Sequence, residues 1–171
     1  MLMTKEKKIF KKNKSYRIEE IIGYYIKSDA FCKLGSASQK DYHDCLMVID
    51  GDIGGINIRR LDVQNMQSLY NLWLGRGIYR ANKIAAIMSI LINWAKKNGI
   101  SMENPMPLLD KTPNPPRKVM WEPEQVNQFL HTAYSEWKWR SIGLIVQMAY
   151  EWGQRVGDMR MLTWAAINFD K

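Results

Sequence analysis

Apolar residues recur at helical spacing along most of this chain, whereas the alternation typical of half-buried strands is nearly absent. Helical spacing places apolar side chains on one face, which must be buried against another element. The first such run follows Ser15, a candidate N-cap, and consists of Ile18, Ile21, Ile22 and Tyr25. The sequence therefore predicts a mainly α protein.

A second helix is expected after Ser38, whose side chain can cap the first free amides of a helix. Its apolar face comprises Tyr42, Cys45, Leu46 and Ile49. A group of glycines then interrupts the pattern, consisting of Gly51, Gly54 and Gly55. Because no strand precedes these glycines and the GxGxxG spacing is absent, they are interpreted as turn residues, not as a phosphate-binding loop.

Asp62 is expected to open a third helix, and the fourth is expected from about Arg80 to Asn98. Gly99 follows where a left-handed residue can close the fourth helix. The third helix would bury Met66, Leu69, Tyr70 and Trp73, and the fourth Ile84, Ile87, Met88, Leu91 and Ala95. Four helices with short connections predict a compact bundle.

Prolines then accumulate, and a helix cannot continue through them because proline lacks an amide donor and restricts the residue before it. They are Pro105, Pro107, Pro113, Pro115 and Pro116. The predicted organisation is a basic disordered tail at 1–14, a helical domain at 15–104, a stiff linker at 105–119 and a second domain at 120–171.

The second domain should begin with a helix at Glu122-Pro123-Glu124, since proline suits the first helical position and acids suit the first turn. Its apolar face comprises Val126, Phe129, Leu130 and Ala133. The next segment, from Ser141 to Trp152, is apolar on nearly every side, which is typical of a helix inside a larger core. About 50 residues bury too little surface to cover such a helix. Its cover is expected from sequence beyond Lys171 or from a partner.

The net charge of +8 and a pI of about 9.5 favour a nucleic-acid partner. The tail at 1–14 carries +5 of this charge, so a solvated tail that only aids solubility is the alternative. Cys32 and Cys45 form no CxxC motif, which argues against a disulfide framework or a metal site. No signal peptide and no apolar run of about 20 residues is visible, so a cytoplasmic, nucleoid-associated protein is expected without membrane contact.

The most specific motif runs from Gly153 to Asp170 and reads GQRVGDMRMLTWAAINFD. This run resembles the first catalytic-arginine motif of the tyrosine recombinases, the phage-integrase family. Weaker landmarks follow the family's order, namely Ser38, Tyr42, Asp62, Asn82, Ala95, Asn98-Gly99, Asn104-Pro105 and Glu124. The resemblance implies a four-helix, SAM-like core-binding domain followed by the helical beginning of a catalytic domain.

The resemblance also implies site-specific DNA recombination through a 3′-phosphotyrosine, without a metal or nucleotide cofactor. Arg155 matches the family's first arginine, whose planar guanidinium can hold two oxygens of the scissile phosphate. Asp158 matches an acidic position that supports the site and is expected on the same helical face as Arg155. By position, Lys40, Arg80 and Lys83 are candidates for contacts with duplex DNA, and solvated surface side chains are the alternative for each.

The family's later catalytic residues have no counterpart after Arg155, because all eight tyrosines and both histidines precede it. The chain is therefore interpreted as the DNA-binding N-terminal portion of a recombinase, inactive alone, whose full-length form acts as four protomers on two duplexes. A DNA-binding regulator without catalysis and a helical protein-interaction module with an accidental motif are the alternatives. Trp164 and Ile167 are expected in the core, and a strand is expected at Ile167-Asn168-Phe169.

Overall fold

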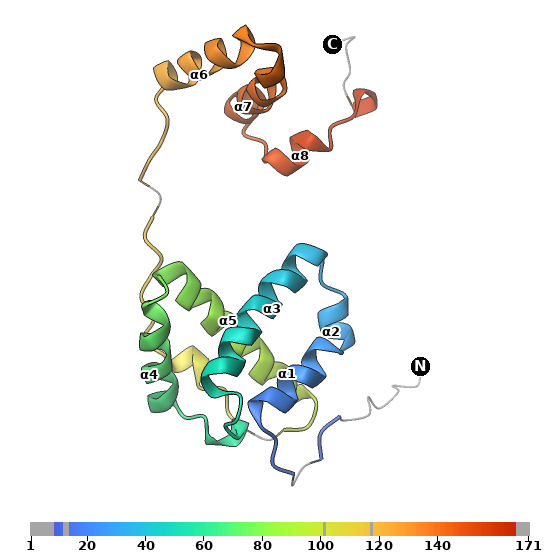
Figure 1. Ribbon diagram of the computed structural model, residues 1–171, viewed down its shortest axis with the longest axis vertical. Helices are drawn as coiled ribbons and strands as arrows, with labels where there is room; N and C mark the ends of the chain where they lie inside the picture. Colours follow the sequence, from blue (N-terminus) through green and yellow to red (C-terminus); the bar gives the residue numbers. More distant parts are fainter. Residues whose placement is uncertain (1–8, 12–13, 101, 117, 167–171) are drawn as a thin grey trace. The chain divides into compact units, whose positions relative to one another are not determined.

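The computed structural model describes residues 9–11, 14–100, 102–116 and 118–166, with the backbone alone for Trp164. The chain divides into two compact units, Met1–Pro115 (unit 1) and Pro116–Lys171 (unit 2) (Figure 1). The predicted mainly α architecture is confirmed, since every element within the described ranges is a helix. The only β-type pairing there is an isolated bridge between Arg17 and Asn57. The strand expected at 167–169 lies outside the described residues, as do Ile167 and the side chain of Trp164.

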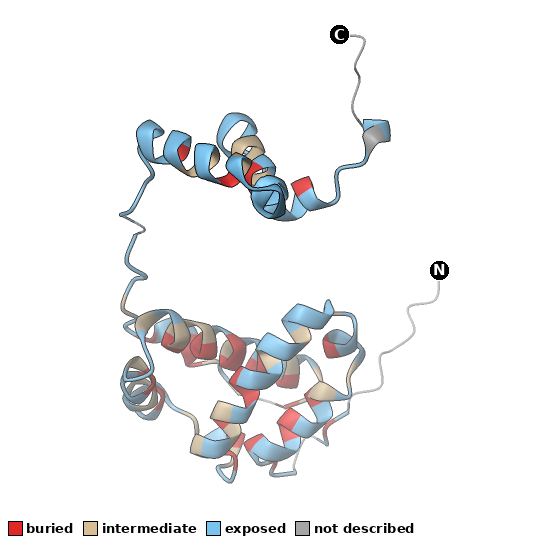
Figure 2. Ribbon diagram, turned by 45° about the horizontal axis from the view of Figure 1, so that its top comes forward, coloured by how far each residue is buried: buried red, intermediate tan, exposed pale blue. Residues whose placement is uncertain are grey.

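Unit 1 is built around one long central helix. Its described elements are α1 (Ile18–Ile26), α2 (Asp29–Cys32), α3 (Ser36–Ile53), the 3-10 helix η1 (Ile58–Arg60), α4 (Val63–Leu74), α5 (Ile78–Lys97) and the 3-10 helix η2 (Met106–Leu108). The central helix α5 packs against α1, α3, α4 and η2. Figure 2 shows buried residues on the facing sides of these helices, whereas most of unit 2 is exposed.

Helix α4 supplies the two largest fully buried side chains, Trp73 and Tyr70. The Trp73 indole Nε1 donates a hydrogen bond to Asp52 Oδ2 at 2.9 Å, and the Tyr70 hydroxyl donates to Asn82 Oδ1 at 2.8 Å. Asp52 also lies 3.6 Å from the guanidinium of Arg76. The polar ends of both aromatic side chains are therefore satisfied, which permits their burial.

The starts of two helices differ from the prediction. Helix α1 is capped by Arg17, whose amide donates to Glu20 Oε2 at 2.8 Å, while the Ser15 hydroxyl accepts a hydrogen bond from the Asn57 side chain. Helix α3 begins at Ser36, so Ser38 lies inside the helix and does not cap it. Serine is a favoured N-cap residue, which is why the sequence predicted Ser15 and Ser38 as caps. The actual caps depend on backbone conformation and on partners elsewhere in the chain.

The other helix boundaries of unit 1 agree in part with those predicted from the sequence. Helix α3 continues through Gly51 to Ile53, because an isolated glycine weakens a helix without ending it. The four-residue α2 was not predicted, since one turn carries no measurable periodicity. Asp62 does cap α4, accepting from the Asn65 amide at 2.7 Å, and Gly99 follows α5 with a positive φ of 116°.

Phe10 belongs to the core of unit 1, although the sequence placed it in the disordered tail. Its side chain is 4% exposed and meets the rings of Tyr16 and Trp94 edge-on. Its amide donates to the carbonyl of Asn98 at 3.0 Å. The chain is therefore anchored to the core of unit 1 at this residue.

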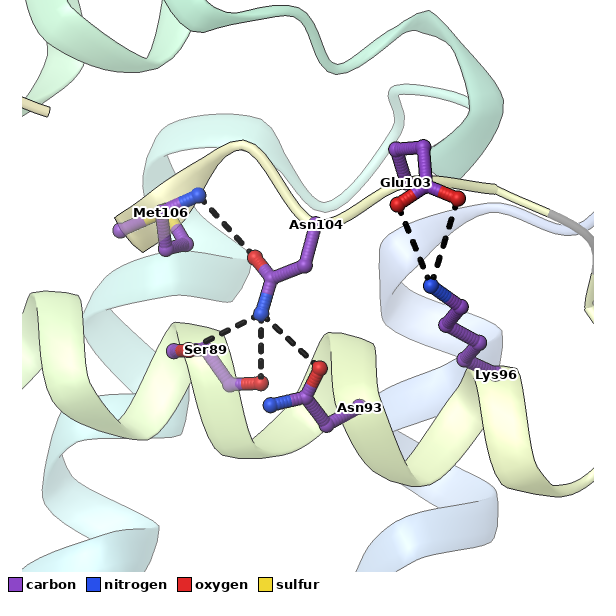
Figure 3. Close-up of polar contacts among 6 residues, drawn as sticks. All are labelled: Ser89, Asn93, Lys96, Glu103, Asn104 and Met106. Atoms are coloured by element: carbon purple, nitrogen blue, oxygen red, sulfur yellow. Dashed lines mark hydrogen bonds and ion pairs between the residues drawn. The ribbon is translucent and has the colours of Figure 1, made fainter. Parts of the chain in front are cut away.

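Residues 104–115, which we call the strap, lie along α4 and α5 and are part of unit 1. Figure 3 shows that the Asn104 side chain bridges into α5, donating to Ser89 Oγ and Asn93 Oδ1 at 3.0 Å each. Its oxygen accepts from the Met106 amide at 3.0 Å. Met106 is fully buried, so the strap has an apolar anchor as well as polar ones.

Further along the strap, side chains of α4 and α5 bind its backbone. The Tyr70 hydroxyl accepts from the Thr112 amide at 3.0 Å, and Asn82 Nδ2 donates to the Thr112 carbonyl at 2.9 Å. The Tyr79 hydroxyl donates to the Pro115 carbonyl at 2.6 Å. Most of the segment predicted as a linker is thus fastened to unit 1.

Unit 2 is a helical hairpin with a short third helix. Its described elements are α6 (Pro123–Ser135), the 3-10 helix η3 (Trp137–Trp139), α7 (Arg140–Trp152), α8 (Val156–Arg160) and the 3-10 helix η4 (Trp164–Ala166). Helix α6 starts as predicted, with Pro123 in the first turn and the Glu122 amide donating to Gln125 Oε1 at 2.9 Å. A Cβ added at Gly143 would lie 3.0 Å from the Cβ of Ala133, so this glycine permits the close approach of α6 and α7.

Helix α7 matches the predicted segment, but the described residues do not bury it. Gly143 is its one buried residue, whereas Ile142 and Leu144 are 45% and 53% exposed. The cover that the sequence predicts for α7 is therefore not provided by the described residues of unit 2.

Candidate nucleic-acid interface

The packing of α3 against α5 brings together the three cations predicted to contact DNA. Lys40 lies on α3, and Arg80 and Lys83 lie in the first two turns of α5. Asp41 of α3 is next to Lys40 in the chain, and its Oδ2 atom lies 2.7 Å from Lys83 Nζ. Arg80 and Lys40 also act electrostatically on this carboxylate. We call Lys40, Asp41, Arg80 and Lys83 the α3–α5 charge cluster.

The charges of the cluster shift the ionisation of its one acid. The hydrogen bond from Lys83 is the largest cause that lowers the pKa of Asp41, followed by the charge of Lys83, while Arg80 and Lys40 contribute less. Asp41 therefore carries a full negative charge at neutral pH. The side chains of Lys83 and Asp41 are 40% and 55% exposed, so a ligand can reach them from solvent.

The cluster lies over the core and beside a helix end. Cys45 is fully buried one turn beyond Asp41, and burial raises the pKa of its thiol while Arg80 and Lys83 oppose this shift. The first turn of α5 contains no acidic residue. The positive end of the α5 dipole therefore adds to the potential of the cations above it.

Asp41 was not among the predicted site residues. Its neighbour Lys40 was, but a pair between Asp41 and Lys83 depends on how α3 and α5 pack, and the two residues are 42 positions apart. No local pattern in the sequence signals this pair.

Arg155 lies at the corner between α7 and α8. Helix α7 ends at Trp152 and is capped by Gly153, which has a φ of 63° in the left-handed region where glycine is favoured. Arg155 then caps α8 with an extended backbone, and its carbonyl accepts from the amides of Asp158 and Met159 at 3.0 and 3.1 Å. Its side chain is exposed and forms no hydrogen bond or ion pair within the described part of the chain. The guanidinium is thus available to a ligand.

Asp158 does not share a helical face with Arg155, contrary to the prediction, because Arg155 precedes the helical backbone of α8. The ion pairs found among the described residues do not join these two side chains. Asp158 lies in the first turn of α8, where an acid interacts favourably with the helix dipole.

The short helix α8 is held to α7 by apolar side chains. Met159 is 8% exposed and lines an apolar pocket with Met148 and Trp152 of α7. This contact and the turn at Gly153 together fix the backbone position of Arg155 relative to α7. The sequence motif identified Arg155 but did not predict this corner. The feature of the sequence that indicates the corner is Gly153, two residues before Arg155.

Within the described ranges, no three His, Cys, Asp or Glu side chains are grouped as they would be around a metal ion. None of the helices described there is both long and apolar enough to span a membrane.

Neither a protein-family model nor a curated protein matches the sequence. The structure is similar to that of a lambda integrase dimer bound to a COC′ core site, with a TM-score of 0.74, 18% identity and 90% of this chain covered. It is also similar to the Tn1549 transposon integrase in complex with circular intermediate DNA, with a TM-score of 0.71, 15% identity and 91% coverage. Both integrases are tyrosine recombinases. The chain has the fold of the matched half of these tyrosine recombinases.

The same transposon integrase in complex with transposon right end DNA gives a TM-score of 0.70 at 15% identity over 90% of this chain. The matched regions are 44%, 52% and 50% of the three integrase chains, so this chain spans about half their length. The tyrosine-recombinase fold inferred from the arginine motif and the ordered landmarks is confirmed, and the fold class is that of the family's helical part.

Proposed function

We propose that this chain is the DNA-binding portion of a site-specific tyrosine recombinase, an enzyme that cuts and rejoins DNA through a 3′-phosphotyrosine. The observation that carries the proposal is the gathering of Lys40, Arg80 and Lys83 on adjoining helices of a fold shared with integrases solved on DNA. The proposed partners are duplex DNA and further protomers of the whole recombinase, and the proposed place of action is the cytoplasm.

The α3–α5 charge cluster is suited to the phosphate backbone. Lys40 and Lys83 offer compact point charges, and Arg80 offers a planar fork that can hold two phosphate oxygens. Such contacts position a protein on the duplex without reading its sequence. Lys40, Arg80 and Lys83 are therefore proposed as positioning contacts.

Arg155 is proposed to hold the scissile phosphate. Its exposed guanidinium has no competing partner among the described residues, and two parallel hydrogen bonds to the non-bridging oxygens would offset charge that develops in the transition state. Asp158 is proposed to support this position, because its carboxylate lies in the first turn of α8, where it stabilises the short helix that Arg155 caps.

The direct test of the proposal is a salt titration. The chain is expected to bind a labelled duplex with an affinity that falls steeply with salt, because each neutralised phosphate releases counterions. Engagement of the three cations predicts a slope of log affinity against log salt of about −2.7 or steeper. Fluorescence anisotropy measures this slope, and a duplex of the same sequence with uncharged methylphosphonate linkages is the control. Binding that ignores salt, or that is equally tight to the uncharged duplex, would contradict the proposal.

Arg155→Ala is expected to change duplex affinity by about twofold or less, since a cation that touches no phosphate acts only through a screened field. Its proposed partner is the scissile phosphate of an assembled site, not the general backbone. Arg160→Ala is the matched control, because it removes the same charge from an exposed position at the other end of α8. A large loss of affinity with Arg155→Ala alone would show that Arg155 is a general DNA contact.

A further inference from the structure

We propose that Asp41 restrains DNA binding at the α3–α5 charge cluster by occupying Lys83 in place of a phosphate. This inference rests on the proposed function, because it concerns the same surface and the same ligand. It assigns a role to an acid that lies among three cations expected to bind an anion.

The geometry of the pair supports competition for one cation. Lys83 Nζ lies 2.7 Å from Asp41 Oδ2, a distance typical of a charge-assisted hydrogen bond. A carboxylate and a phosphate present the same kind of acceptor oxygen to an ammonium group. An ammonium that is held by Asp41 therefore has less of its charge and fewer of its donors available to DNA.

The surroundings of Asp41 extend this effect beyond Lys83. Arg80 and Lys40 both lower the pKa of the Asp41 carboxyl, which places all three cations within its electrostatic reach. A phosphate that approaches any of the three meets the negative charge of Asp41 as well. Binding must either open the Lys83–Asp41 contact or accept this repulsion.

The restraint is expected to be partial. Both side chains of the pair are substantially exposed, and exposed ion pairs are weak, so a duplex with many phosphates can displace Asp41. Because phosphate contacts are independent of sequence, the restraint lowers affinity for DNA in general.

A purely structural role is the competing explanation, since the pair also joins α3 to α5. That role predicts that loss of the carboxylate loosens the helix pair and weakens DNA binding. The proposed restraint predicts the opposite change in affinity, so the sign of the effect separates the two.

The test compares Asp41→Asn with Glu103→Gln in the full chain. Asn keeps the shape of the side chain and frees Lys83. The control removes the same charge and frees Lys96, whose Nζ atom lies 3.3 Å from Glu103. Lys96 lies on α5, as Lys83 does, but about 20 Å further along the helix axis. Asp41→Asn is expected to tighten binding to a random-sequence duplex about fivefold, the upper range for an exposed ion pair, whereas the control should change affinity by about twofold or less. Equal tightening by both variants, no tightening or weaker binding by Asp41→Asn would overturn the proposal.

A second measurement follows the carboxyl group itself. The carboxyl carbon of Asp41, observed by NMR, should titrate with a higher pKa when a duplex is added, because Lys83 turns to phosphate and negative charge approaches Asp41. An unchanged pKa in the bound state would overturn the proposal.

If the wild-type chain binds DNA through the three cations but Asp41→Asn has no effect, this inference fails and the proposed function stands. If the wild-type chain shows no salt-dependent binding, both fail.

Discussion

Replacement of Trp73 by alanine is expected to lower the free energy of unfolding of unit 1 by about 4 kcal/mol. Trp73 is the largest of the fully buried side chains, so its loss removes apolar contacts and leaves a cavity in the core of unit 1. The change also deprives Asp52 of the indole donor 2.9 Å away, although Asp52 keeps its pairing with Arg76.

Hydrogen exchange of the slowest amides in α5 measures this loss, because these amides exchange only when the core of unit 1 opens. Leu72→Ala is the matched control, since Leu72 precedes Trp73 in α4 but is 61% exposed. The control should cost less than about 1 kcal/mol. Similar losses for the two variants would show that Trp73 does not fill the core described here.

Neutralisation of all three cations of the charge cluster is expected to weaken duplex binding by about 100-fold at low salt. The variant is Lys40→Gln, Arg80→Gln and Lys83→Gln combined. The effect is large because three phosphate contacts are lost together and Asp41 remains as an unopposed negative charge. Fluorescence anisotropy measures the affinity, and circular dichroism verifies that the helical content is kept.

The control for this variant neutralises three exposed lysines elsewhere in unit 1, namely Lys27, Lys33 and Lys97. Both triple variants reduce the net charge equally, so they differ only in where the charge is removed. The control is expected to weaken binding by less than about tenfold, through the general field alone. Equal losses would mean that net charge, and not the α3–α5 charge cluster, governs binding.

Long periodic segments could be predicted from the sequence, and short or paired features could not. The fourth predicted helix, from about Arg80 to Asn98, corresponds to α5 at Ile78–Lys97, because many apolar residues at one spacing outweigh any single exception. The prediction that Ser15 and Ser38 cap helices was wrong, because a helix cap depends on only two or three residues. Many residues have a side chain that can cap a helix, and only the folded backbone determines which of them does so.

The strap and Phe10 show a different limit. Prolines and charges predicted a stiff interdomain linker and a disordered tail, but Met106 and Phe10 supply apolar anchors, and Tyr70 and Asn82 bind the strap backbone. These partners are 30 or more residues from Thr112 in the chain, so no local pattern reveals them. The same applies to the site, where the motif identified Arg155 but the pairing of Asp41 with Lys83 depends on the packing of α3 on α5.

Because the strap is fastened to unit 1, only a short segment of free chain connects it to unit 2. The last bond of the strap is at Pro115, and α6 begins at Pro123, so chain length limits the distance between these residues to roughly 28 Å. That distance corresponds to about eight base-pair steps, which is less than one turn of a duplex. With unit 1 bound to DNA as proposed, the start of α6 would stay within this distance of Pro115. Unit 2 would then meet the same DNA at an effective concentration that free diffusion would not supply.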